Sequence, residues 1–230
     1  MTTALVLSAG GMFAAWEVGV WKALAAHFQP DLVVGASAGA WNGWAIAGGI
    51  APEELIENWL HPSVSAIRIL RGEPLRQKAC ELWSRFQPQL PFGLTVVETP
   101  NFRTRLIRER EITWRHLAAT CSIPALFPPV AIEGRFYVDG GLKGALPLWA
   151  AEEMGATRLI AVNCLNGLPF RVLRRLLPPR PCSPELPVIS ITPSERLGSL
   201  LDALYWSRSN IERWVSLGER DGMRALSSVC

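Results

Sequence analysis

Residues 31–47 read DLVVGASAGAWNGWAIA, and the pentapeptide Gly-Ala-Ser-Ala-Gly lies at 35–39 within them. The apolar run Leu32–Val34 predicts a buried strand, and the small and apolar residues after Ser37 predict a buried helix. A serine at a sharp strand-to-helix turn exposes its hydroxyl, and small neighbours allow the backbone to turn. Gly35 and Gly39 are such neighbours, so the segment predicts an α/β fold with a nucleophilic Ser37. It also fits a plain glycine-rich turn in which Ser37 only caps the helix.

Outside this segment the chain continues to alternate between strand and helix patterns. Ala4–Leu7 is an apolar run that ends in a glycine turn, and Ala15–Phe28 follows with helical spacing that places Glu17 away from its apolar face. This alternation indicates a mainly parallel sheet covered on both faces. No repeat or linker pattern interrupts residues 1–230, which we expect to form one domain. We expect further helices over Pro52–Leu60, Pro74–Phe86, Thr113–Cys121, Pro147–Met154 and Leu197–Leu217, and further strands over Leu94–Val97, Phe136–Val138, Leu159–Val162 and Val188–Ile191.

The composition argues against several classes of protein. Apolar residues make up 49% of the chain and charged residues 19%, which indicates a globular protein with a large core. Its 23 Lys and Arg against 20 Asp and Glu give a net charge of +3, too small and too scattered for a nucleic-acid-binding surface. The N-terminus lacks the positively charged start of a signal peptide. The five cysteines have no metal-ligand spacing, so we expect a reduced, cytoplasmic chain without a bound metal.

A nucleophilic serine needs a base, and the histidines are poor candidates for that role. His27 and His61 lie at the ends of predicted helices, and His116 lies inside another. A triad histidine usually sits in a glycine turn after a strand. A Ser–His–Asp triad is therefore the less favoured arrangement.

Three segments, taken in chain order, resemble the patatin-like phospholipase family. Residues 7–11 (LSAGG) are similar to its glycine-rich oxyanion loop, residues 35–39 to its nucleophile elbow, and residues 137–142 (YVDGGL) to its Asp-Gly-Gly motif. Residues 118–130 (AATCSIPALFPPV) are similar to the stretch before that motif. The resemblance runs from about residue 4 to residue 163. It implies a three-layer α/β/α fold and a lipid acyl hydrolase that uses a Ser–Asp dyad and no cofactor.

In such a dyad Asp139 is the only acid–base partner of Ser37. An aspartate that accepts a serine proton must be close and partly desolvated, because a free carboxylate is a weak base at neutral pH. Gly140 and Gly141 follow it and allow a tight turn and a close approach. Without the resemblance, Asp139 is better interpreted as an ordinary Asx-turn residue.

Backbone amides of the first glycine loop are the expected oxyanion hole. Gly10 and Gly11 allow the backbone to approach the substrate closely, and the amide of Met12 is a further candidate donor. General hydrolase geometry adds the amide of Ala38, immediately after the nucleophile.

The chain departs from the family pattern at four positions. Ala9 replaces a glycine of the loop, Ala14 replaces its last glycine, and Ala145 replaces an asparagine downstream of the Asp-Gly-Gly motif. Phe13 stands where the family usually has Arg or Lys, which favours a neutral ester or thioester over a phospholipid. Two alternatives therefore stay open: an acyltransferase with the same acyl-enzyme, and a catalytically weakened member that binds lipid or a partner.

The substrate side is less specific. Phe13, Trp16, Trp41 and Trp44 flank the two glycine loops and are candidates for an acyl pocket, although large buried aromatics are more often plain core. Phe170–Arg180 sorts apolar and basic residues in a way that fits transient contact with an anionic membrane surface or a solvated surface helix. The sequence indicates no oligomeric state.

Overall fold

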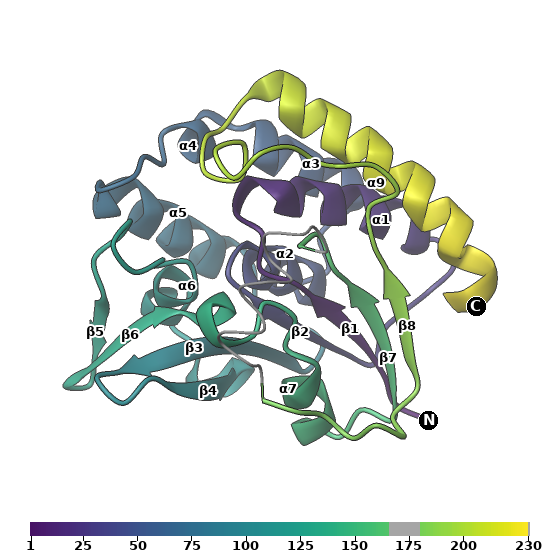
Figure 1. Ribbon diagram of the computed structural model, residues 1–230, viewed down its shortest axis with the longest axis horizontal. Coiled ribbons are helices and arrows are strands. Elements are labelled where there is room, and N and C mark those ends of the chain that lie inside the picture. The colour runs from purple at the N-terminus through teal and green to yellow at the C-terminus, as the bar shows by residue number, and fades with distance from the viewer. Residues whose placement is uncertain (166–179, 230) are drawn as a thin grey trace.

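The computed structural model describes residues 1–165 and 180–229. Its centre is an eight-stranded sheet with the order β5-β6-β3-β2-β1-β7-β8, in which β4 also pairs with β3. β3, β2, β1, β7 and β8 are parallel to one another, whereas β4, β5 and β6 are antiparallel to their partners. Helices cover both faces (Figure 1). The prediction of a three-layer α/β/α fold with a mainly parallel sheet is confirmed.

The strands and helices have the following bounds. The strands are β1 (Thr3–Leu7), β2 (Leu32–Ala36), β3 (Phe92–Thr99), β4 (Arg103–Arg108), β5 (Val130–Ile132), β6 (Arg135–Asp139), β7 (Arg158–Val162) and β8 (Val188–Ile191). The helices are α1 (Ala14–Leu24), α2 (Ala38–Ala47), α3 (Pro52–Leu60), α4 (Pro62–Ser65), α5 (Gly72–Arg85), α6 (Trp114–Thr120), α7 (Leu148–Glu153) and α9 (Arg208–Val229), with short 3₁₀ turns η1 (Gly11–Phe13), η2 (Glu109–Glu111) and η3 (Gly140–Lys143).

The central strands send alternate side chains into two separate cores. Leu5 and Leu7 of β1 belong to the large cluster that includes α1, α2 and α9. Ala4 and Val6 of the same strand pack with Trp149 of α7 on the opposite face. This period of two is the pattern of a strand buried on both sides, and it explains why β1 is apolar throughout.

Strand β3 brings Ser37 close to Asp139 because it has three partners and only two edges. β4 pairs with residues 93–98 and takes one edge. The other edge is shared by β2, which pairs with residues 92–95, and β6, which pairs with residues 96–99. β2 is parallel to β3 and β6 antiparallel, so their C-terminal ends meet. Ala36 pairs with Thr95 and Asp139 with the next residue, Val96, so Ser37 follows β2 directly at the end of β6.

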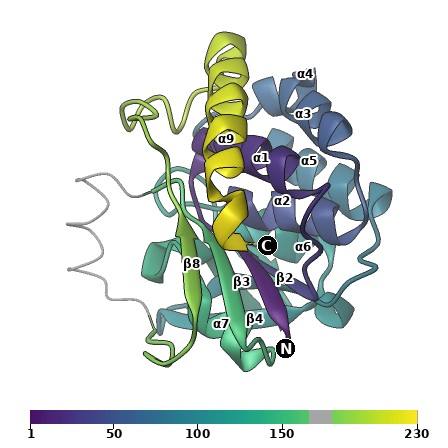
Figure 2. The ribbon, with the colours of Figure 1, turned by 90° about the vertical axis from the view of Figure 1, so that its right-hand side faces the viewer.

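Helix α9 packs closely across α1, on the side of the sheet away from α7 (Figures 1 and 2). A Cβ atom added at Gly19 would lie 2.0 Å from the carbonyl oxygen of Val215, and one added at Gly218 would lie 2.0 Å from that of Trp16. The indole Nε1 of Trp16 donates a hydrogen bond of 2.9 Å to Asp221 Oδ2. Glycine is therefore required on both helices where they touch.

Several expectations for the chain need correction. The helix predicted over Leu197–Leu217 is wrong at its start, since α9 begins at Arg208 and the preceding residues form turns. Asp202 Oδ2 accepts hydrogen bonds from the backbone N–H and the hydroxyl of Ser199, which offers the backbone an alternative to a helix. The polar edge strand β4 and the short β5 were not predicted.

The predicted amphipathic segment Phe170–Arg180 falls almost entirely outside the described residues, which resume at residue 180. Among the helices of the described ranges, none combines the length and the apolar character needed to cross a membrane.

Candidate active site

Ser37 lies in a strained turn between β2 and α2. Its φ of 52° and ψ of −132° are unusual for a residue with a side chain. The glycines beside it have no room for a Cβ: at Gly35 it would lie 2.5 Å from Ala40 Cα, and at Gly39 it would lie 2.2 Å from Ser8 O. The closely packed start of α2 therefore holds the serine in this conformation.

Three hydrogen bonds fix the nucleophile candidate. The backbone N–H of Ser37 donates to Thr120 Oγ1 at 2.9 Å, and that hydroxyl donates to Thr95 O of β3 at 2.8 Å. The Ser37 hydroxyl donates to Asp139 Oδ2 at 2.6 Å. Strand β3 and the end of α6 thus hold the serine with its hydroxyl directed at the carboxylate.

Asp139 is held equally firmly and is 4% exposed. Its Oδ1 accepts the Gly141 N–H at 2.7 Å, and its own N–H donates to Ser122 O at 3.0 Å. Burial raises the pKa of Asp139 to about 7, although the hydrogen bonds from Ser37 and Gly141 act in the opposite direction. A carboxyl with this pKa can both accept and return a proton at neutral pH.

The histidines make other contacts. His61 Nδ1 lies 2.8 Å from Ser63 Oγ, and His116 Nδ1 accepts the backbone N–H of Thr113 at 3.1 Å as part of a helix-capping box. His27 is exposed after α1. Asp139 is the carboxyl group that the fold places against the Ser37 hydroxyl.

The first glycine loop and Ser37 line the same two cavities. Within the described ranges the N–H groups of Gly10, Gly11 and Ala38 donate no hydrogen bond to the protein. The N–H of Met12 instead donates to Ala203 O at 2.9 Å. Of the four predicted oxyanion donors, the N–H of Met12 is therefore already hydrogen-bonded within the protein.

Ser37 lines both cavities. The inner cavity has a volume of about 70 Å³, and its wall includes Gly11, Met12, Ser37, Ala38, Trp41, Asn42, Asn58, Trp59, Val64, Ile67, Leu75, Lys78 and Phe127. The outer cavity has a volume of about 320 Å³, and its wall includes Ala9, Gly10, Gly11, Ser37, Pro124, Asp139, Gly141, Leu142, Gly144, Ala145, Leu165, Leu200 and Leu204. Asp139 contributes to the outer cavity only. Its wall, as far as the described residues form it, holds no cationic side chain.

A family model described as patatin-like phospholipase matches residues 5–108 and 60–152. The chain belongs to this family. It is 29% identical over 189 residues to lysophospholipase NTE1 of Scheffersomyces stipitis, which corresponds to 69% of this chain and 11% of that protein. It is also 29% identical over 177 residues to an uncharacterized NTE family protein of Mycobacterium tuberculosis, corresponding to 71% of this chain and 49% of that protein. The chain thus spans half or less of the length of these relatives.

A solved structure agrees with the patatin-like fold. VipD from Legionella pneumophila superposes with a TM-score of 0.57 at 10% sequence identity, over 99% of this chain and 67% of that one. At this identity the likeness concerns the fold alone.

The patatin-like site uses only part of the predicted aromatic pocket. Trp41 lines the inner cavity, and its Nε1 donates to Leu117 O at 2.7 Å. Phe13, Trp16 and Trp44 line neither cavity. Phe13, at the end of η1, packs edge-on against Trp214 of α9 at 5.1 Å between ring centroids. Trp16 and Trp44 are fully buried core residues.

Asn58, Trp59 and Lys78 are cavity residues that the sequence reasoning missed. Lys78 had a recognisable signal, since it lies three residues after Leu75 and four before Leu82 on the buried face of α5. A lysine on the apolar stripe of a helix is unusual.

The prediction that Glu17 points away from the core is wrong, because this residue is buried beneath the glycine loop. Its Oε1 accepts the Ser8 hydroxyl at 3.0 Å, and its Oε2 accepts Asn42 Nδ2 at 3.2 Å. The N–H of Cys164 donates to the same serine oxygen at 3.0 Å. Burial raises the pKa of Glu17 to about 8, so this carboxyl is mostly protonated at neutral pH.

Proposed function

We propose that this patatin-like chain is a serine acyl-ester hydrolase acting on lipids through a Ser37–Asp139 dyad. The observation that carries the proposal is the 2.6 Å hydrogen bond from the Ser37 hydroxyl to Asp139 Oδ2. The strained turn of Ser37 and the raised pKa of the buried Asp139 carboxyl are the features an activated nucleophile and its base require.

The reaction follows from these positions. Asp139 takes the hydroxyl proton as Ser37 Oγ attacks the ester carbonyl, and the carbonyl electrons move onto its oxygen. The N–H groups of Gly10, Gly11 and Ala38, which donate to no acceptor among the described residues, are the donors we assign to that oxyanion. The intermediate then collapses, and the departing alcohol takes the proton from Asp139. Water repeats the sequence on the acyl-enzyme and releases the acid.

The two cavities indicate how the ester is oriented at Ser37. The group that returns a proton must lie beside the leaving oxygen, and Asp139 lines only the outer cavity. The leaving alcohol therefore occupies the outer cavity and the acyl group the inner one. An outer wall without a described cation favours a neutral alcohol over a phosphate-bearing one. The inner cavity of about 70 Å³ is about half the size of an engineered cavity that holds benzene, so short acyl groups fit best.

Labelling by a fluorophosphonate probe tests the dyad. The native chain should be labelled, Ser37→Ala should not, and Asp139→Asn should react at least about 10³-fold more slowly. Ser216→Ala, at an exposed serine of α9, is the matched control and should label like the native chain. Full labelling of Asp139→Asn would refute the dyad. Product analysis with an added alcohol separates hydrolysis from acyl transfer, because only a transferase makes more acylated alcohol than free acid.

A further inference from the structure

The inner cavity is largely apolar but contains a small polar patch. Besides Ser37 and the weakly polar thiol of Cys121, its polar side chains are Asn42, Asn58 and Lys78. Asn42 is committed to the fold: its Nδ2 donates to Ala14 O and to Glu17, and its Oδ1 accepts the indole N–H of Trp59 at 2.8 Å. The Asn58 amide keeps hydrogen-bonding capacity, and Lys78 is its partner.

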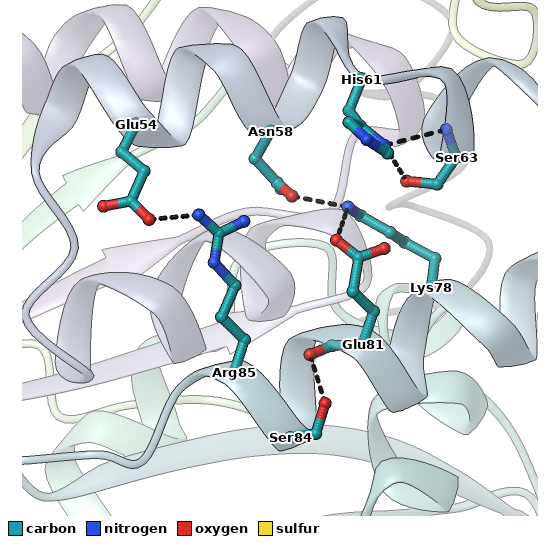
Figure 3. Close-up of polar contacts among 8 residues, drawn as sticks. All are labelled: Glu54, Asn58, His61, Ser63, Lys78, Glu81, Ser84 and Arg85. Carbon is teal, nitrogen blue, oxygen red and sulfur yellow. Dashed lines mark hydrogen bonds and ion pairs between the residues drawn. The ribbon is translucent and has the colours of Figure 1, made fainter.

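Lys78 and Asn58 form one cluster between α3 and α5 (Figure 3). Lys78 Nζ donates to Asn58 Oδ1 at 2.5 Å and to Glu81 Oε1 at 2.8 Å. The Lys78 side chain has an exposed fraction of 0%, so its ammonium group holds Asn58 in place and does not itself face the cavity. Asn58 Nδ2 has no hydrogen-bond partner within the described ranges. Both residues are more than nine-tenths buried, with Asn58 8% and Lys78 1% exposed.

An unfilled amide donor in a largely apolar cavity wall favours a ligand that brings an acceptor, because a polar group that a ligand covers without pairing costs free energy. The charges of the cluster indicate which kind of acceptor this is. Lys78 is already paired with Glu81, and the neighbouring Arg85 is paired with Glu54. A carboxylate brought into the cavity would therefore leave an excess negative charge in a largely apolar space. A neutral oxygen would fill the Asn58 donor without adding charge.

We propose that Asn58, held in place by Lys78, forms a polar subsite in the inner cavity that donates from Nδ2 to a neutral acceptor oxygen, such as an ether, keto or hydroxyl oxygen, on the acyl chain of the substrate. This inference rests on the proposed function, which places the acyl chain in that cavity. An unsubstituted chain would contact the apolar wall equally well but leave the Asn58 donor unfilled. The subsite therefore selects oxygenated acyl chains over plain alkyl chains of the same length.

The test uses p-nitrophenyl esters of matched chain length, in which one methylene at successive positions is replaced by an ether oxygen. The quantity to compare is the ratio of kcat/KM for an ether ester to kcat/KM for the plain ester. For the best oxygen position, this ratio should be at least about ten in the native chain. Lys78→Met, which keeps the side-chain length, and Asn58→Leu should each bring this ratio close to one. Arg85→Met removes an exposed cation from the same helix and should leave the ratio unchanged.

Either of two kinetic outcomes overturns the subsite. One is a native ratio near one at every oxygen position, and the other is an unchanged ratio in both variants with native melting temperatures. Binding of the same esters to Ser37→Ala, measured by calorimetry, separates this inference from the proposed function. Equal dissociation constants for ether and plain esters refute the subsite, whereas turnover that survives Ser37→Ala refutes the dyad.

Discussion

Replacing Glu17 by glutamine should remove a large pH dependence from the stability of the fold. Burial raises the pKa of this carboxyl from 4.5 to about 8. Between those two values the folded chain keeps a proton that the unfolded chain has released. The free energy of unfolding then falls by about 1.4 kcal/mol for each pH unit, or about 5 kcal/mol in total, as the pH rises through this window. The stabilisation is fully present below pH 4.5 and lost above about pH 8.

Glutamine can take the place of the protonated carboxyl. Its amide can donate to Ser8 Oγ, and the serine hydroxyl can turn toward Cys164 Sγ, which lies 3.3 Å away. Burial raises the pKa of the Cys164 thiol well above 9.0, so that neighbour stays protonated across the window. Relative to the native chain, Glu17→Gln should gain about 4 kcal/mol in the free energy of unfolding between pH 5 and pH 8.

Urea denaturation followed by tryptophan fluorescence, repeated from pH 5 to pH 8.5, measures the difference directly. Asp139, whose pKa is also raised, contributes equally to both proteins and cancels in the comparison. Glu53→Gln, at an exposed position of α3, is the control and should follow the native curve. Parallel curves for native chain and Glu17→Gln would show that Glu17 is ionised in the folded state and refute the reasoning.

Three further predictions concern the dyad and the close contacts. Because Asp139 must be ionised to act as a base and its pKa is about 7, kcat/KM should rise with pH and reach roughly a tenth of its plateau at pH 6; a flat profile from pH 5 to 8 would argue against this base. Gly39→Ala forces a Cβ to within 2.2 Å of Ser8 O and should cost about 1–3 kcal/mol, measured as a lower urea midpoint. Gly218→Ala meets Trp16 O at 2.0 Å and should lower the melting temperature by several degrees; an unchanged value would mean that α9 can shift freely.

The nucleophile turn was predictable because its causes are local. The strand, the small residues and the helix that define the turn are contiguous in residues 31–47, and the structure contains each of them. The approach of Asp139 is not local, since it depends on two strands that share one edge of β3. Nothing in the sequence around Asp139 specifies that pairing, so only the family resemblance indicated it.

The pocket was harder to predict because its walls come from several helices. The aromatic residues next to the glycine loops were natural candidates, but Phe13 packs against Trp214 of α9. Of the polar wall residues, Asn58 and Lys78 come from α3 and α5, far from the motifs in the sequence. Glu17 was misplaced for a related reason: helical spacing ranks a glutamate as exposed, whereas Ser8 and Asn42 supply partners for it inside.

The glycine contact between α1 and α9 has a consequence for how such a chain can change. Each helix offers the other a bare backbone surface, and the two surfaces lie about 200 residues apart in the sequence. A larger side chain on one helix becomes tolerable only if the other helix moves or is altered at the same time. Mutagenesis of α1 or α9 alone should therefore give mostly destabilised variants at this contact. A library that randomises both helices together could find new pairs of residues that pack against each other.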